Sequence, residues 1–351
     1  MLTVSSSPID VLFRCDGGSL VGLGHVKRCI AIAAVLRQRY GLTSALSGTF
    51  DKTALAVIDA SDIAVMHSSS EFDEETWIDR HLDVHRPRVL ICDIRTDLSP
   101  RALMRLKRKL ALLITLDDAS DRRLVSDIAL LPPTADALDL LWPDFKGEAL
   151  IGWAWVVLAT PPVMRKDVRA LREPPYQLLV TMGGADPAGL TLRIARNLRV
   201  FGENIMPHFV IGPAFSDPER TAAALLGMWP CGRIYRNLPD LGDPMREADL
   251  AICAYGVTAQ ELAAAGVPAL YIALSDDHAQ AADALAATGA GQNLGVHGDL
   301  ADEDFRMHVS RLLRNAQSRE RMSVAGPRSI DGRGAERIAE RVMRAMNAKA
   351  A

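Results

Sequence analysis

The feature that most constrains the fold is a strand, a glycine-rich loop and a helix, which follow one another between Leu12 and Leu36. The segment Val11–Cys15 is apolar and short enough for a buried strand, whereas the apolar run from Ile30 is typical of a buried helix. Glycines of such a loop permit positive φ and close approach of the backbone to a ligand. The helix that follows directs unpaired N–H groups into the loop, so an anionic group fits there. The loop glycines are Gly17, Gly18, Gly22 and Gly24.

His25 is the one side chain in this loop that exchanges a proton near neutral pH. It stands at the start of the helix, where the dipole disfavours the imidazolium and keeps a free base available. We therefore predict that His25 is the catalytic base. A plainer interpretation stays open, because many doubly wound proteins carry such a loop for packing alone and a histidine there often only caps the helix.

Strand-like and helix-like segments alternate along the whole chain, which predicts parallel sheets covered by helices. Two Rossmann-like domains follow from this pattern, at residues 1–160 and 176–330, joined by a proline-flanked linker at 161–175. A basic helix within 331–351 is expected to pack back on the first domain. We expect the carboxyl ends of both sheets to face one cleft, where ligands of such folds bind.

The segments behind this prediction divide into two sets. Expected strands are Thr43–Leu46, Ile63–Met66, Val89–Asp93, Leu112–Leu116, Ser126–Leu131, Tyr176–Thr181, His208–Ile211, Gly232–Tyr235, Leu250–Cys253 and Ala269–Ala273. Expected helices are Phe72–His81, Arg101–Leu110, Gly189–Val200, Glu219–Leu226, Ala259–Ala265, Gln280–Ala287 and Gly334–Ala348.

Composition excludes several classes of protein. The 351 residues are 49% hydrophobic and 24% charged with a net charge of −3, so the basic surplus that nucleic-acid binding needs is missing. The five cysteines form no CxxC pair, which favours reduced core residues in a cytoplasmic protein. The N-terminus lacks the features of a secretory signal, and the longest apolar run, Ala149 to Ala159, is too short for a membrane anchor. We expect a monomer.

The second half carries another strand, glycine turn and helix at Thr181 to Thr191. Gly183 and Gly184 would let the chain approach a phosphate, and Asp186 followed by Pro187 is typical of a helix start, with Asp as the N-cap. The same residues also fit a tight turn with no ligand.

A further candidate site follows the strand Leu250–Cys253, where Tyr255-Gly256-Val257-Thr258 leads into a helix. Backbone N–H groups and the Thr258 hydroxyl would receive a diphosphate there. Glu261 lies one turn on, where a carboxylate can accept hydrogen bonds from the hydroxyls of a ribose. The alternative is that Glu261 only complements the helix dipole.

Polar side chains also follow the next strand, at Asp276, Asp277, His278 and Gln280. They are expected at the same edge of the sheet as Thr258 and Glu261. Adjacent Asp and His side chains can be metal ligands, but no third ligand at helical spacing accompanies them. We therefore expect no metal and no cofactor.

Together these motifs resemble one family. The blocks VLFRCDGGSLVGLGHVKR, TMGGADPAGLTLRIA and AYGVTAQE…GVPALYI are similar to the UDP-2,4-diacetamido-2,4,6-trideoxy-β-L-altropyranose hydrolases of pseudaminic acid biosynthesis. Their wider relatives are GT-B glycosyltransferases related to glycosyltransferase family 28. The resemblance runs from about Val11 to about Leu294, and the FR-D…GxGHxxR core of the first block is quite specific.

The resemblance implies a GT-B fold and metal-independent attack of water on the anomeric carbon of a UDP-sugar, in the synthesis of a nonulosonic acid for surface or flagellar glycans. It implies that His25 activates the water, that Gly183 and Gly184 hold the diphosphate, and that Glu261 binds the ribose. The remaining residues expected to bind substrate or nucleotide are Asp16, Gly22, Gly24, Arg28, Asp93, Tyr255, Gly256, Val257, Thr258, Asp277 and His278.

The chain departs from the family at the sugar side. Ile94 and Arg95 follow Asp93 where the family often has an aromatic residue, and Asp277-His278 stands at its usual Asn-Gln pair. The phosphate loop also reads Tyr255-Gly256-Val257 in place of GGS. Three functions are therefore carried forward: a hydrolase, a GT-B glycosyltransferase with a UDP-sugar donor, and an inactive nucleotide-sugar binder.

Overall fold

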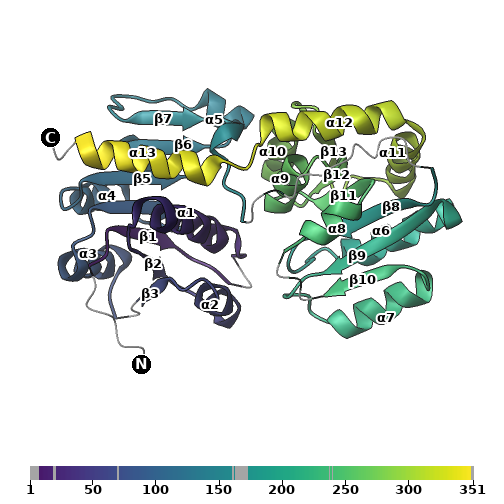
Figure 1. Cartoon of the computed structure of the whole chain (residues 1–351), viewed down its shortest axis with the longest axis horizontal. Helices are drawn as coiled ribbons and strands as arrows, with labels where there is room; N and C mark the ends of the chain where they lie inside the picture. Colours follow the sequence, from purple (N-terminus) through teal and green to yellow (C-terminus); the bar gives the residue numbers. More distant parts are fainter. Residues whose placement is uncertain are drawn as a thin grey trace. The chain divides into compact units, whose positions relative to one another are not determined.

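The computed structural model describes residues 8–18, 21–68, 71–159, 162, 173–236, 238 and 240–348. It divides into two compact units, one of Met1–Ala159 with Arg333–Ala351 and one of Thr160–Gly332. Each unit is built on a parallel sheet, and helices alternate with its strands along the chain (Figure 1). The predicted α/β class with two Rossmann-like domains is confirmed. Most of the expected linker at 161–175 lies outside the described residues.

The first sheet has the strand order β3-β2-β1-β4-β5-β6-β7, with every pair parallel. Because the chain leaves β1 toward β2 on one side and later returns to β4 on the other, the order reverses between β1 and β4. The loops at such a switch point diverge and leave room for a ligand at the carboxyl ends of the strands. The strands are β1 (Val11–Cys15), β2 (Ser44–Gly48), β3 (Ala64–His67), β4 (Val89–Asp93), β5 (Leu112–Leu116), β6 (Ile128–Leu131) and β7 (Glu148–Ile151).

Alternation of side chains along β1 divides the core of this unit into two layers. Phe13 points into one apolar cluster and Leu12 into the other, and both side chains are fully buried. Both faces of the sheet are therefore covered. The helices of the unit are α1 (Gly24–Tyr40), α2 (Lys52–Asp59), α3 (Glu74–His85), α4 (Pro100–Lys107) and α5 (Ala135–Asp139), with short 3₁₀ turns η1 (Asp121–Val125) and η2 (Trp153–Trp155).

The C-terminal helix α13 (Gly334–Ala348) lies in the first unit, where it packs against α1. Its apolar face contributes Ile338, Val342 and Met346 to the same cluster that holds Phe13. The helix begins at Gly334, where an added Cβ would lie 2.0 Å from the carbonyl oxygen of Val156. This close approach needs glycine, since any side chain would push the helix off the sheet.

The second sheet has the order β10-β9-β8-β11-β12-β13, again parallel throughout, with its switch point between β8 and β11. Its strands are β8 (Tyr176–Thr181), β9 (Ile205–Ile211), β10 (Arg233–Arg236), β11 (Leu250–Ala254), β12 (Ala269–Ala273) and β13 (Gly291–Val296). Its helices are α6 (Leu190–Leu198), α7 (Pro218–Met228), α8 (Gly242–Glu247), α9 (Val257–Ala264), α10 (Asp276–Ala286), α11 (Asp302–Arg314) and α12 (Ala316–Ser329), with the 3₁₀ turn η4 (Arg199–Asn204).

Sequence patterns miss β7 and β13, each at one edge of its sheet, but find the opposite edge strands β3 and β10. The segment Gly291–Val296 contains Gln and Asn and is only partly buried over most of its length, as is usual for a strand with a single neighbour. The pattern also places the start of α10 four residues too late, because its first turn is polar and exposed. The central strands β1, β4, β5, β8 and β12 match their predicted bounds.

Four of the five cysteines are buried and one, Cys231, is exposed, and all five are free thiols. Burial raises the pKa of the Cys92 thiol to about 12, so it stays protonated and unreactive at neutral pH. Within the described residues, every helix is too short or too polar to span a lipid bilayer.

Candidate active site

The loop between β1 and α1 is held by close backbone contacts. A Cβ added to Gly17 would lie 2.4 Å from Cγ2 of Val26, so glycine is needed for α1 to pack on this loop. Gly18 and Gly22 exchange two backbone hydrogen bonds of 3.1 and 2.7 Å. Tight packing therefore explains Gly17, while an added Cβ on Gly22 would meet no atom of the described residues within 4 Å.

His25 lies in the first turn of α1, as predicted, and contacts the end of β4. Its Nδ1 lies 2.7 Å from Oδ1 of Asp93, the last residue of that strand. Arg28, one turn further along α1, donates from Nε to Oδ2 and from Nη2 to Oδ1 of the same carboxylate, both at 2.7 Å. The switch point between β1 and β4 thus brings together three residues that lie up to 68 positions apart in the sequence.

Asp93 is fully buried, and its charge is stabilised by Arg28 and His25. Burial alone would raise the pKa of this carboxyl, but the charge of Arg28 and the hydrogen bonds from His25 and Arg28 outweigh it and lower the pKa to about 2. Burial likewise opposes the charge of Arg28, and the carboxylates of Asp93 and Asp117 more than compensate, which raises the pKa of Arg28. Both groups are therefore ionised at neutral pH.

The shorter of two contacts assigns the tautomer of His25, since Nδ1 lies 2.7 Å from Oδ1 of Asp93 and 3.3 Å from Nη2 of Arg28. An ionised carboxylate only accepts hydrogen bonds, so the proton of a neutral His25 ring is assigned to Nδ1, which faces Asp93. The lone pair then lies on Nε2. About a fifth of the side chain is exposed. The geometry is that of a histidine base oriented by a buried aspartate.

Two residues expected to contact substrate have other partners in the structure. Both oxygens of Asp93 are engaged by His25 and Arg28, so this carboxylate orients the His25 ring. Asp16 accepts hydrogen bonds from Arg14 Nη1 at 2.7 Å and from the N–H of Thr49 at 2.8 Å, which ties the loop after β1 to the loop after β2. Sequence spacing did not indicate these contacts, because hydrogen-bond partners from distant strands cannot be read from it.

Asp117 is a site residue that sequence reasoning missed. It follows β5, and its Oδ2 lies 3.5 Å from Nη1 of Arg28 and 2.9 Å from Nη2 of Arg95. Its φ is 51°, a left-handed conformation that Asp adopts more readily than most residues. The available signal was its position, since it follows a buried strand next to β4 in the sheet.

In the second unit, the glycine turn after β8 differs from the prediction at the helix start. Helix α6 begins at Leu190, and Asp186 lies four residues before it with φ 46°. Its carboxylate accepts from the N–H of Leu190 at 2.7 Å and of Thr191 at 2.9 Å. Asp186 therefore caps α6, but Pro187 is not in its first turn. The cap occupies N–H groups that an anion would need.

The start of α9 is different. Its N-cap residue is Gly256, which offers no side-chain acceptor, and helix residues Val257 and Thr258 follow directly. An added Cβ on Gly256 would meet no atom within 4 Å, so the approach to this helix start is open. Gly183, across the switch point after β8, is equally open and has φ 77°, which favours glycine. Glu261 lies one turn into α9 and is half-buried.

Residues Asp276, Asp277 and His278 form the first turn of α10, and not a loop before it. Ser275 caps this helix by accepting from the N–H of His278. The His278 ring lies 6.5 Å from the ring of Tyr255, so the starts of α9 and α10 are neighbours, as expected for adjacent strands β11 and β12. Among the described residues, no three His, Cys, Asp or Glu side chains cluster as a metal site requires.

Comparisons with known proteins agree on the fold. No model of a protein family matches the chain. The spore coat polysaccharide biosynthesis protein SpsG of Bacillus subtilis is 23% identical over 329 residues, which span 92% of this chain and 94% of that protein.

Solved structures extend the comparison to the whole chain. The structure of MurG from Acinetobacter baumannii matches with a TM-score of 0.71 and 17% identity, over 96% of this chain and all of that one. UDP-GlcNAc 2-epimerase from Neisseria meningitidis, solved with UDP-GlcNAc bound, matches with a TM-score of 0.64 and 12% identity, over 95% and 100% of the two chains. Structures named as glycosyltransferases match in the same range. The chain therefore has the GT-B fold that was predicted.

Proposed function

We propose that this protein is an enzyme of polysaccharide biosynthesis that uses a UDP-sugar, with His25 as the general base. The observation that carries the proposal is the hydrogen bond from Nδ1 of His25 to the buried Asp93 carboxylate. It leaves Nε2 to take a proton from a hydroxyl that attacks the anomeric carbon. UDP departs with the bridging oxygen, because the bond that breaks joins that oxygen to the sugar carbon.

The nucleotide is assigned to the second unit. The open start of α9 at Gly256 and Thr258 suits a diphosphate, since backbone N–H groups and the positive end of a helix stabilise phosphate charge. Glu261, one turn on, is the candidate for the ribose hydroxyls. The names of the relatives support this assignment: SpsG is a polysaccharide biosynthesis protein, and the epimerase was solved with UDP-GlcNAc bound.

The attacking group decides between two activities. Glycosyl transfer to a sugar hydroxyl takes first place, because solved structures with the same fold include proteins named as glycosyltransferases. Hydrolysis is the second candidate, favoured by the FR-D…GxGHxxR block around His25. The pseudaminic acid pathway and its sugar belong to this second candidate.

The test follows UDP release from UDP-GlcNAc and other UDP-sugars, with and without a panel of alkyl glycosides as acceptors, in water enriched in ¹⁸O. Release that depends on an acceptor supports transfer. Release without acceptor, with the label in the free sugar and not in UDP, supports hydrolysis. Tight UDP binding with no release under any condition would contradict both activities and leave a nucleotide-sugar binder.

A further inference from the structure

The charged groups around His25 continue beyond Asp93 and Arg28. Asp117 stands 3.5 Å from Nη1 of Arg28, and Arg95 stands 2.9 Å from the same oxygen of Asp117. From His25 outward, the contacts run through Asp93, Arg28, Asp117 and Arg95, so negative and positive charges alternate. Arg28 is thus shared between a buried carboxylate and one that is about a third exposed.

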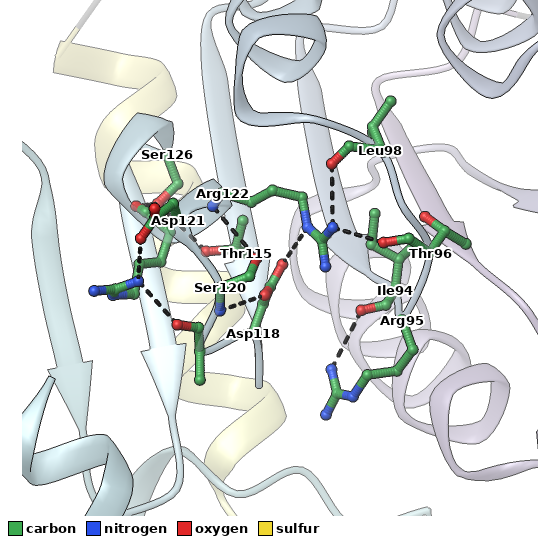
Figure 2. A network of polar contacts seen from close by, with 12 residues as sticks. Ile94, Arg95, Thr96, Leu98, Thr115, Asp118, Ser120, Asp121, Arg122 and Ser126 are labelled. Atoms are coloured by element: carbon green, nitrogen blue, oxygen red, sulfur yellow. Dashed lines mark hydrogen bonds and ion pairs between the residues drawn. The ribbon is translucent and has the colours of Figure 1, made fainter.

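Arg95 and Asp117 sit on loops that a buried ion pair fixes together, and Figure 2 shows this pair, Arg122 with Asp118. Arg122 donates from Nε to Asp118 at 2.7 Å, and from Nη1 to the carbonyl oxygens of Thr96 at 2.7 Å and Leu98 at 3.1 Å. Thr96 neighbours Arg95, and Asp118 neighbours Asp117. One guanidinium therefore holds both the loop after β4 and the loop after β5.

A buried ion pair of this kind is a weak source of stability, because desolvation offsets the attraction, and it is better suited to specify one conformation. Here the conformation that it specifies places Arg95 against Asp117 and Asp117 against Arg28. The backbone supports the same arrangement, since the N–H of Asp117 donates to the carbonyl oxygen of Leu130 at 2.7 Å.

We propose that Asp117 and Arg95 are positioning residues that act on His25 through Arg28 and set the pH range in which it accepts a proton. The inference rests on the proposed function. An opposite charge near a titrating group favours its charged form and a like charge disfavours it. Asp117 offsets the positive charge of Arg28, and Arg95 in turn offsets the charge of Asp117. Asp117 therefore favours the protonated form of the His25 ring, and Arg95 disfavours it.

Other charged groups near the loop are engaged elsewhere. Asp16, after β1, contacts Arg14 and the N–H of Thr49, and Asp51 caps α2 through the N–H groups of Thr53 and Ala54. Lys27 on α1, Lys52 on α2 and the Arg14–Glu74 pair are further charged groups of neighbouring elements and stay unchanged in every variant. Differences between the variants below therefore report on the Arg28–Asp117–Arg95 chain.

The test compares Asp117→Asn with Arg95→Gln, each of which removes one charge at a partly exposed position. Asp117→Asn leaves the charge of Arg28 less neutralised, which disfavours protonation of His25. The acid limb of the pH profile of kcat should therefore move to lower pH by about half a pH unit. Arg95→Gln strengthens the effect of Asp117 and should move the limb to higher pH by a similar amount. Loss of stability cannot produce shifts of opposite sign, and circular dichroism checks that both variants are folded.

Arg105→Gln is the matched control. Arg105 on α4 forms an exposed ion pair with Glu75 on α3, so this change also removes one guanidinium. It should leave the profile unmoved. A second readout needs no substrate: the titration of the ¹³C-labelled His25 ring in the ligand-free protein, assigned with His25→Asn. Absence of turnover in the unmodified protein would count against the proposed function alone. Shifts of the His25 titration that are absent, or of the same sign in both variants, would overturn the role of Asp117 and Arg95.

Discussion

The two units use the same strand, loop and helix arrangement at their switch points, yet they fill it with different chemistry. At the first, between β1 and β4, two side chains, His25 and Arg28, are hydrogen-bonded to the buried Asp93. At the second, between β8 and β11, the loops present glycines with open space, Gly183 and Gly256. One architecture thus carries a cluster of charged side chains in the first unit and open glycines in the second.

The difference follows from what each task requires. A general base must have one defined tautomer and orientation, and a histidine in the role proposed for His25 would have such a partner in Asp93 at the end of β4. A diphosphate instead needs N–H donors with no competing acceptor. Within the second unit, α6 shows the opposite case, because Asp186 already occupies its first N–H groups.

The largest effect is expected at His25. His25→Asn removes the base and should lower turnover on the order of a hundredfold or more, while UDP affinity stays the same. Turnover is measured by UDP release and affinity by titration calorimetry. His67→Asn, at an exposed position of β3, is the control and should behave like the unmodified protein. Full activity of His25→Asn would show that His25 is not the general base.

The next effect concerns stability at low pH. The pKa of Asp93 is lowered to about 2 from 3.8, so its ion pair contributes stability above about pH 4, and this contribution is lost as pH falls toward 2. A shift of this size corresponds to about 2 kcal/mol. Urea unfolding should show Asp93→Asn to be less stable by at least this amount at pH 6, since Arg28 loses its partner.

The gap between Asp93→Asn and the unmodified protein should narrow on acidification. Asp121→Asn, at an exposed carboxylate, should show neither the loss nor its pH dependence. A gap that stays constant from pH 6 to pH 2 would mean that Asp93 is not the ionised partner of Arg28.

A smaller effect is expected at Glu261. Glu261→Ala should weaken UDP binding about tenfold, because a charge-assisted hydrogen bond to a ribose hydroxyl is lost. Calorimetry with UDP measures it, and Glu219→Ala, on the exposed side of α7, serves as the control. Unchanged affinity for UDP in Glu261→Ala would place the nucleotide elsewhere.

The smallest effect separates the two helix starts of the second unit. Asp186→Ala removes the cap of α6 and should lower the free energy of unfolding by about 1 kcal/mol, with UDP affinity unchanged. Thr258→Val, at the start of α9, should do the reverse and weaken UDP binding with little loss of stability. If Asp186→Ala weakened UDP binding and Thr258→Val did not, the diphosphate site would belong to the turn after β8.

The sequence by itself determined the α/β class, the two parallel sheets and the bounds of the central strands, because buried parallel strands are short apolar runs that need no partner to be recognised. It also placed His25 at a helix start after a glycine loop. The edge strand β13 escaped because its sequence, with Gln, Asn and two glycines, carries a weak apolar signal.

Only the tertiary structure decided how the site works. Asp93 and Asp117 lie at the ends of strands 68 and 92 residues after His25 in sequence number, and only the strand order β1-β4-β5 brings their carboxylates to α1. The same holds for Asp186, whose local pattern indicated a helix start but whose carboxylate caps N–H groups four and five residues ahead. Spacing along the chain specifies which elements form, whereas hydrogen-bond partners and charge compensation depend on which elements become neighbours.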